Sequence, residues 1–205
     1  MNPKRHWEQV YANKPTAALG WYTPHLQTSL DWIKDLGLTA NAPIIDVGGG
    51  ASTLVDDLLD AGYRSITVLD LSGQALSLGK ARLANRSAAV SWIEGDVTLT
   101  ELPARHFALW HDRAVFHFLI EPAQQHAYRN QLLKALQPGG HFIIGTFAPE
   151  APAKCSGLPV QRYDPQRLER TFGEEFALQR QRNELHVTPG GVEQMYLYCQ
   201  FRRAA

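Results

Sequence analysis

Three consecutive glycines follow an acidic residue in the run PIIDVGGGAS. The acid is Asp46, and the glycines are Gly48, Gly49 and Gly50. A loop without Cβ atoms lets a ligand approach the main chain, and the N-terminus of a following helix offers unpaired N–H groups to a carboxylate or phosphate. Three glycines in a row exceed what a tight turn requires. The run therefore predicts a ligand-binding loop beside a carboxylate.

The elements on either side must hold this loop in place. Residues 44–47 are rich in β-branched side chains, as in a strand buried on both faces, and the apolar residues of 54–59 recur at helical spacing. Ser52 or Thr53 can accept a hydrogen bond from an amide of the first helical turn, and Gly62 can end the helix in a left-handed conformation. The sequence thus predicts a strand, a glycine loop and a helix in succession.

A second acid, Asp70, ends the predicted strand SITVLD, residues 65–70. A carboxylate in this position can accept hydrogen bonds from both hydroxyls of a ribose. A dinucleotide-binding loop would read G-x-G-x-x-G, but counted from Gly48 and Gly50 the third glycine position is Thr53. This departure weighs against a nicotinamide dinucleotide as the ligand.

The pattern Asp46-x-Gly48-x-Gly50-x-Ser52 resembles motif I of the class I S-adenosylmethionine-dependent methyltransferases, D/E-x-G-x-G-x-G, with Ser52 in place of the last glycine. The similarity continues in the family's strand order over about half of the chain, in the segments SITVLD, AVSWIEGDV, HFALWHDRAVFHFL and LQPGGHFIIGTF. The resemblance implies S-adenosylmethionine as the cofactor, S-adenosylhomocysteine as its product, and no metal.

The resemblance also implies roles for residues at the ends of these strands. Asp70 is expected to bind the ribose diol, and Asp96 the adenine amino group. Leu71 and Val97 are expected to pack against the adenine ring. Together with Asp46 and the three glycines, they make up the predicted cofactor site.

The family's fold is predicted for the chain, an α/β three-layer sandwich in which helices cover both faces of a mostly parallel seven-stranded sheet with an antiparallel last strand. MYLYCQF, residues 195–201, is apolar or aromatic on both alternating faces, as in a strand placed between two others. With the preceding EFALQRQRNELHV it predicts a closing hairpin. We expect one methyltransferase domain over residues 1–205, with residues 1–42 as an N-terminal helical cap.

Composition narrows the partners and the location. The 205 residues include 20 basic and 20 acidic side chains, so the sequence does not predict the basic face that a nucleic-acid partner requires. No run approaches the roughly 20 apolar residues of a membrane span, and the N-terminus lacks the apolar core of a signal peptide. Cys155 and Cys199 are too few for a disulfide framework, which predicts free thiols and a cytoplasmic location.

Methyl transfer from a sulfonium needs a nucleophile in line with the S–CH3 bond and a site that excludes water. A base is needed only if the acceptor arrives protonated. The segment WHDRAVFHFL follows the predicted fourth strand, where the family contacts its substrate. It offers His111 as a proton acceptor, Asp112 as a base or cation anchor, and Arg113 as an anion anchor. Alternatively, Asp112 and Arg113 form a local ion pair, and His111 or His117 is an interior histidine.

Two further resemblances point to different acceptors. Asp112-Arg113-Ala114 is similar to the D-R-A/G stretch of thiopurine-type thiol methyltransferases, which implies a small thiol or another small nucleophile. The W-x-x-x-Y pattern of Trp7 and Tyr11, followed by a Trp-Tyr pair at 21–22, is similar to the start of small protein-lysine methyltransferases. The sequence lacks the Asn/Asp-Pro-Pro-Tyr/Phe motif of many amide and exocyclic-amine methyltransferases. Small-molecule transfer is the leading hypothesis, and lysine methylation or an inactive cofactor-binding module are the alternatives.

Three segments can cover the substrate edge of the sheet: the chain before Pro43, residues 147–163, and residues 186–191. Helix packing explains Trp7, Tyr11 and Trp32 by their spacing, whereas Cys155 is either a ligand contact or an ordinary buried cysteine. The predicted substrate-binding residues are Trp21, Tyr22, His117, Cys155 and His186.

Overall fold

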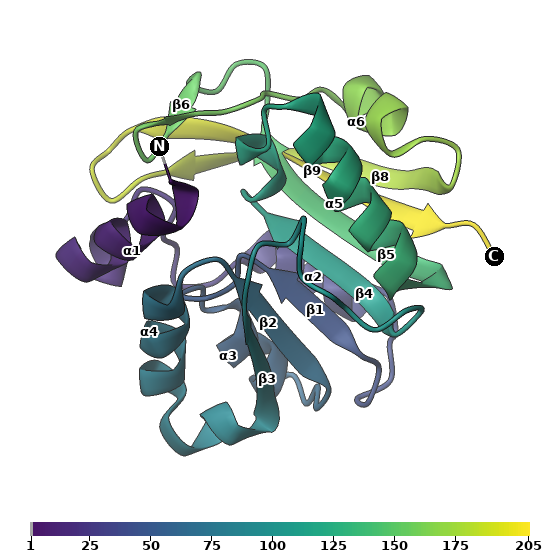
Figure 1. Cartoon of the computed structure of the whole chain (residues 1–205), viewed down its shortest axis with the longest axis horizontal. Coiled ribbons are helices and arrows are strands. Elements are labelled where there is room, and N and C mark those ends of the chain that lie inside the picture. Colours follow the sequence, from purple (N-terminus) through teal and green to yellow (C-terminus); the bar gives the residue numbers. More distant parts are fainter. Residues whose placement is uncertain (1) are drawn as a thin grey trace.

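The computed structural model describes residues 2–205, and a seven-stranded sheet in the order β3-β2-β1-β4-β5-β9-β8 runs through it (Figure 1). Strand β9 is antiparallel to both of its neighbours, and the other pairs are parallel. The strands are β1 (Ile44–Val47), β2 (Ile66–Asp70), β3 (Val90–Glu94), β4 (Phe107–Arg113), β5 (Leu136–Phe147), β8 (Phe176–Val187) and β9 (Glu193–Arg203). This topology confirms the predicted sheet and the predicted place of the last strand between two others.

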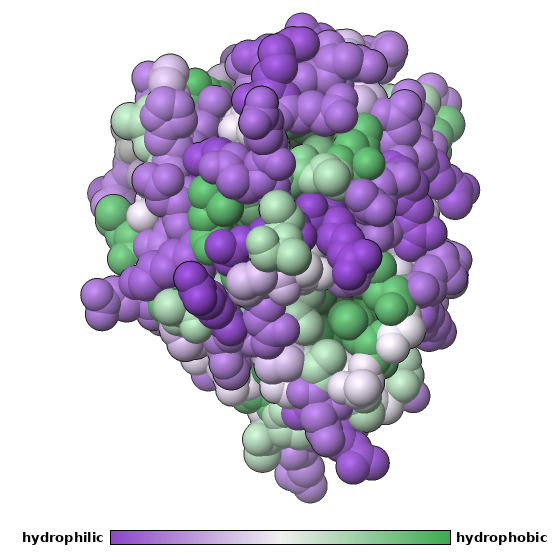
Figure 2. Space-filling view, turned by 90° about the vertical axis from the view of Figure 1, so that its right-hand side faces the viewer, coloured by the Kyte–Doolittle hydropathy of each residue, from purple (hydrophilic) through white to green (hydrophobic). Residues whose placement is uncertain are grey.

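Helices cover both faces of the sheet, as predicted. One apolar core lies between the sheet and α5 and α6, and a second core lies between the sheet and α2, α3 and α4. The helices are α1 (Pro3–Asn13), α2 (Gln27–Asp35), α3 (Leu54–Asp60), α4 (Gly73–Leu83), α5 (Pro122–Ala135) and α6 (Pro165–Phe172). Short 3-10 helices span Thr16–Ala18, Ala84–Ala89 and Phe116–Phe118. The outer face on the side of α6 and the C-terminus is largely hydrophilic (Figure 2).

Strand alternation decides which core each residue of β1 joins. Ile45 and Val47 belong to the core under α5 and α6, whereas Ile44 belongs to the core under α2 to α4. Burying each of these side chains fully contributes about 1.5–3 kcal/mol. Asp46 shares the face of Ile44, which directs its carboxylate toward α2.

The predicted succession of strand, glycine loop and helix is present. Ser52 Oγ accepts a hydrogen bond from Leu54 N (3.2 Å) at the start of α3. Gly62 follows α3 in the left-handed region, with φ of 89°. Both features satisfy helix-end groups that lack partners within the helix.

The N-terminal helix α1 lies beside α4 rather than on the sheet (Figure 1). Its Glu8 carboxylate accepts hydrogen bonds from Gly73 N (2.8 Å) and Gln74 N (3.2 Å), the first amides of α4. Lys4 pairs with Glu94 at the end of β3 (2.5 Å). These contacts hold α1 over the carboxyl ends of β2 and β3. Across residues 2–205, no helix combines the length and apolar character needed to cross a membrane.

A two-stranded hairpin, β6 (Lys154–Cys155) and β7 (Leu158–Pro159), lies within the predicted covering segment 147–163. It is outside the main sheet. Together with α1 it supplies walls to the site described next.

Candidate active site

A cavity of about 560 Å³ opens at the carboxyl ends of β1, β2, β3 and β4. Ligands of open α/β sheets bind in this position, where the strand order reverses. The predicted site residues that line it are Asp46, Gly48, Gly49, Asp70, Leu71, Asp96, Val97, His111, Arg113, Trp21 and Cys155. The chain therefore brings most of the predicted site together in one cavity.

Asp70, at the end of β2, joins the cavity wall to the glycine loop. Its Oδ2 accepts a hydrogen bond from Gly50 N (3.0 Å), and its Oδ1 accepts one from Ser72 N (2.8 Å). Burial raises the pKa of Asp70 to about 6. Each carboxylate oxygen has a second lone pair, so Asp70 can still accept a hydrogen bond from a ligand hydroxyl.

Asp96, which follows β3, forms hydrogen bonds within its own turn. Asp96 Oδ1 accepts hydrogen bonds from Thr98 N (2.8 Å) and Thr98 Oγ1 (2.7 Å). Leu71 and Val97 lie in the same part of the cavity wall. This side of the cavity combines carboxylates with apolar side chains, as a nucleoside requires.

The glycine loop packs tightly against the protein itself. A Cβ on Gly48 would overlap the Val115 side chain, and Gly48 has a φ of 74° that disfavours other residues. A Cβ on Gly49 would overlap the Asp46 carboxylate, and one on Gly50 would lie 2.7 Å from Ala75 Cβ. Gly50 does not line the cavity, and its role is to donate to Asp70. The three glycines therefore permit close packing around the loop as well as ligand approach.

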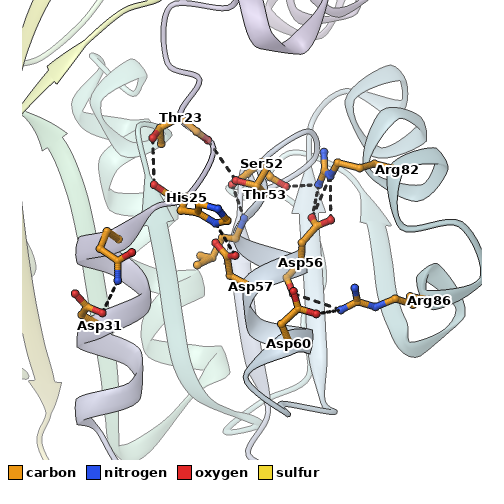
Figure 3. Close-up of polar contacts among 12 residues, drawn as sticks. Thr23, His25, Asp31, Ser52, Thr53, Asp56, Asp57, Asp60, Arg82 and Arg86 are labelled. Carbon is orange, nitrogen blue, oxygen red and sulfur yellow. Dashed lines mark hydrogen bonds and ion pairs between the residues drawn. The ribbon is translucent and has the colours of Figure 1, made fainter.

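Arg82 of α4 holds the far end of the loop (Figure 3). Its guanidinium donates to Ala51 O (3.0 Å) and Ser52 O (2.5 Å) and pairs with Asp56 of α3 (2.7 Å). The sequence does not predict this contact. The only signal is a basic residue in the last turn of one helix and an acid in the first turn of another, and pairing between helices cannot be derived from spacing.

Asp46 and His111 form a buried pair because β1 and β4 are neighbours in register. His111 Nδ1 lies 2.7 Å from Asp46 Oδ1, and His111 Nε2 lies 2.9 Å from Ser29 Oγ of α2. Both ring nitrogens are engaged, so His111 orients Asp46 rather than offering a free nitrogen to an acceptor. Asp46 Oδ2 is buried and has no hydrogen-bond partner within residues 2–205. An unpaired buried carboxylate oxygen on the cavity wall is suited to a cationic ligand group.

Asp112 does not reach the cavity. Its carboxylate accepts hydrogen bonds from Val115 N (2.9 Å), Phe116 N (3.1 Å) and Tyr128 OH (2.7 Å), on the α5 side of the sheet. Burial raises its pKa to about 6. The predicted ion pair with Arg113 is wrong, because adjacent strand residues point to opposite faces and the two side chains have other partners.

Arg113 shares the cavity face of β4 with His111. Its Nε donates to Tyr198 OH (2.9 Å), its Nη1 donates to Trp21 O (3.0 Å), and its Cζ lies 4.2 Å from the centre of the Tyr196 ring. Its Nη2 is buried and lacks a partner among the described residues. Arg113 thus links β4, β9 and the N-terminal segment at the cavity wall.

Three predicted substrate residues lie outside the cavity. His117 is buried, accepts a hydrogen bond from Phe147 N (3.3 Å) and has a pKa lowered by burial to about 3, so its ring is neutral. Tyr22 and His186 line a separate hollow near the turn between β8 and β9, where His186 Nε2 donates to Gly20 O (2.8 Å). The sequence predicts these residues in the site because their segments lie near the edge of the sheet. Their side chains, however, do not line the cavity.

An aromatic wall covers the other side of the cavity. The ring centres of Trp7 and Phe118 are 5.1 Å apart, and those of Tyr11 and Trp21 are 6.2 Å apart. The expectation that helix packing explains Trp7 and Tyr11 missed their place in the cavity lining, although their spacing of four residues puts both on one face of α1. Cys155 of β6 completes this wall, and burial raises the pKa of its thiol to about 11.

The donor and acceptor groups fit S-adenosylmethionine. Asp70 offers acceptors to a ribose diol, Leu71 and Val97 offer apolar contacts to a ring, and Asp46 Oδ2 offers an unpaired acceptor to an ammonium group. Placed along one wall from β3 to β1, these groups match the parts of the cofactor in order.

In sequence, the chain is similar to known methyltransferases. A family profile described as a methyltransferase domain matches residues 44–140, which include β1 to β4. The eEF1A lysine and N-terminal methyltransferase of Bos taurus is 24% identical over 149 residues, covering 70% of this chain and 21% of that protein. The Homo sapiens protein of the same name is 23% identical with the same coverage. The chain thus spans about a fifth of the length of these curated relatives.

Solved structures show the same fold at lower identity. A structure from work on the conversion of a disulfide bond into a thioacetal group during echinomycin biosynthesis has a TM-score of 0.76 at 20% identity, covering 98% of this chain and 91% of that one. The 1,6-didemethyltoxoflavin-N1-methyltransferase of Burkholderia thailandensis, with S-adenosylhomocysteine bound, has a TM-score of 0.71 at 18% identity and covers 98% and 84%. The methyltransferase-domain profile, the glycine loop and the sheet order together support a class I S-adenosylmethionine-dependent methyltransferase.

Proposed function

We propose that the chain transfers a methyl group from S-adenosylmethionine to a small nucleophilic acceptor. The observation that carries the proposal is a single cavity whose nucleoside side, at β1 to β3, continues into a compartment walled by aromatic side chains, Cys155 and Arg113. When bound, S-adenosylmethionine supplies an activated methyl group with its own leaving group. A compartment walled by these side chains suits a small acceptor.

The residues of the chain bind, orient and exclude water. Asp70 accepts from the ribose, and Asp46, oriented by His111, accepts from the cofactor's ammonium group. The aromatic side chains of α1 and its neighbours keep water from the acceptor, which is what an in-line displacement requires.

Asp112, His111 and Cys155 do not act as general bases. Asp112 points to the α5 side, and both nitrogens of His111 are engaged. Cys155 keeps its proton near neutral pH because its pKa is raised. Because none of these three groups serves as a base, the proposal favours an acceptor that presents a lone pair at neutral pH by itself, as a low-pKa thiol or a heteroaromatic nitrogen does. A lysine ammonium must first lose its proton.

Protein lysine methylation is the second candidate, supported by the curated relatives that are named lysine and N-terminal methyltransferases. A cofactor-binding module without catalysis is the third. The test is formation of S-adenosylhomocysteine over a panel of small thiols, heteroaromatic amines and lysine peptides. Turnover of small acceptors supports the proposal, turnover of peptides alone favours the second candidate, and binding without turnover of any acceptor favours the third.

A further inference from the structure

Arg113 is a partly buried cation whose partners are all neutral. They are a phenol, a backbone carbonyl and the face of an aromatic ring, contributed by Tyr198, Trp21 and Tyr196. Four other arginines, by contrast, have a carboxylate within 2.5–2.8 Å: Arg82, Arg86, Arg129 and Arg180. Arginine stays charged in proteins, so Arg113 cannot avoid the cost of burial by losing its proton.

The charge of Arg113 lies at the wall of the cavity. Among the described residues that line the cavity, it carries the only permanent positive charge, whereas Asp46, Asp70, Asp96 and Glu121 are acidic. The acids at the ends of β1, β2 and β3 lie on one side, and Arg113 lies on β4, between β1 and β5, and contacts tyrosines of β9. The wall formed by β1 to β3 is therefore acidic, whereas β4 contributes a cation.

The guanidinium is held in position and still has donor capacity. Three contacts fix its Nε, its Nη1 and its plane, and Nη2 is left without a partner. A carboxylate accepts hydrogen bonds from arginine in a fixed planar geometry, and charge-assisted bonds of this kind are about twice as strong as neutral ones.

From this arrangement we infer that Arg113 forms an anion subsite for the methyl acceptor, which is a small molecule carrying a carboxylate or similar anionic group. The inference rests on the proposed function and deepens it. A cation in this position repels an ammonium group, so it selects against lysine side chains. The aromatic wall next to it favours an acceptor with a flat apolar body.

The experiment uses two aromatic probes of similar size and opposite charge. Benzoate and benzylamine are titrated into the protein saturated with S-adenosylhomocysteine, and binding is followed by calorimetry and by tryptophan fluorescence, since Trp7 and Trp21 line the cavity. We expect benzoate to bind at least about tenfold more tightly than benzylamine. Equal binding, or a preference for benzylamine, would overturn the inference without any variant being made.

Variants then test the residue. Arg113→Gln should weaken benzoate about tenfold or more, and Arg113→Lys should keep part of the preference because the charge remains. Arg180→Gln is the matched control, because Arg180 also stacks on an aromatic ring, that of Trp32 (4.5 Å), but lies outside the cavity lining. Unchanged benzoate binding in a folded Arg113→Gln variant would overturn the inference.

A carboxylate at Arg113 has a second source, the amino-acid end of the cofactor. Decarboxylated S-adenosylmethionine distinguishes the two sources. If Arg113 serves the acceptor, Arg113→Gln changes the affinities for this analogue and for S-adenosylmethionine equally. Selective weakening of S-adenosylmethionine would assign Arg113 to the cofactor and reject the acceptor subsite. Failure of the parent protein to bind S-adenosylhomocysteine would instead count against the proposed function.

Discussion

The ends of β2 and β4 each carry a buried aspartate, and the two have different roles. Asp70 and Asp112 are both almost fully buried, and burial raises the pKa of each to about 6. Asp70 lines the cavity and keeps lone pairs for a ligand, whereas Asp112 uses its carboxylate on Val115, Phe116 and Tyr128. Residue type, position in the strand and pKa are alike, so none of them identifies the ligand-binding carboxylate.

The two carboxylates nonetheless support the same glycine loop from two sides. Asp70 accepts from Gly50 N, and Asp112 holds the turn that presses Val115 against Gly48. Asp70 therefore couples the loop to the ligand, and Asp112 couples it to the core under α5. The role of an acid at the end of a strand therefore depends on the face of the sheet to which its side chain points.

The largest effect is expected where the two supports meet, at Gly48. Gly48→Ala combines an unfavourable positive φ with overlap of Val115, which together should cost about 3 kcal/mol and reduce cofactor affinity about a hundredfold. Gly48→Ala/Val115→Ala removes the overlap but keeps the φ, so calorimetry should show recovery of roughly tenfold. A single variant with parent affinity would show that this side of the loop does not control binding.

Next in size is the loss of the ligand-facing acid. Asp70→Ala removes the acceptors that would bind the ribose and should weaken S-adenosylmethionine by roughly fiftyfold. The measurement is calorimetry on protein whose folding has been checked by circular dichroism. Retention of the parent affinity would show that Asp70 does not bind the cofactor and that Asp70 and Asp112 do not differ in this role.

The structural acid should show the opposite pattern. Asp112→Asn keeps the shape but turns one acceptor into a donor against the turn amides, and should lower the free energy of unfolding by about 2 kcal/mol. Cofactor affinity and turnover of the folded protein should change less than about threefold. Urea unfolding and turnover assays test this, and a stable variant with lost turnover would restore Asp112 as a catalytic residue.

The smallest effect is a dependence on pH. Between pH 4 and 6 Asp70 and Asp112 bind more protons in the folded protein than in the unfolded chain, because their pKa values rise from 3.8 to about 6. His117 has the opposite effect, because its pKa falls from 6.5 to about 3 on burial. As pH falls from 7 to 5, each aspartate should therefore raise the unfolding free energy of the cofactor-free protein by about 1 kcal/mol, whereas His117 should lower it by about 2 kcal/mol. The gain from each aspartate is present at low pH and is lost as pH rises through 6. Asp112→Asn lacks one of these gains, so its loss of stability relative to the parent should be about 1 kcal/mol larger at pH 5 than at pH 7.

The two acids separate again in how pH affects binding. Protonation of Asp70 removes an acceptor from the ligand, so S-adenosylmethionine affinity should fall below pH 6, and Asp112→Asn should leave this fall unchanged. Urea unfolding and calorimetry at pH 7 and pH 5 test both trends. An Asp112→Asn variant whose loss of stability relative to the parent is the same at pH 7 and pH 5 would contradict the raised pKa of Asp112.

The type and order of the elements could be predicted from local patterns. Local patterns specify β1 and α3, because β-branched runs and helical spacing depend on burial of neighbouring residues along the chain. The acid before the glycines and Asp70 at a strand end identified the nucleoside side, because parallel strands place their carboxyl ends at one edge. The apolar pattern of 195–201 likewise predicted a strand with neighbours on both sides, which β9 has.

The contacts of the polar side chains, in contrast, depend on how the elements pack in space. Alternation along β4 places His111 and Arg113 on one face and Asp112 on the other. It does not say which face lies toward the ligand, because that depends on the helices that cover each face. The Ser29 contact to His111, the Arg82 contact to the loop and the place of Trp7 come from α1, α2 and α4. These contacts join segments far apart in the chain, and their geometry is fixed by packing of whole elements rather than by local sequence.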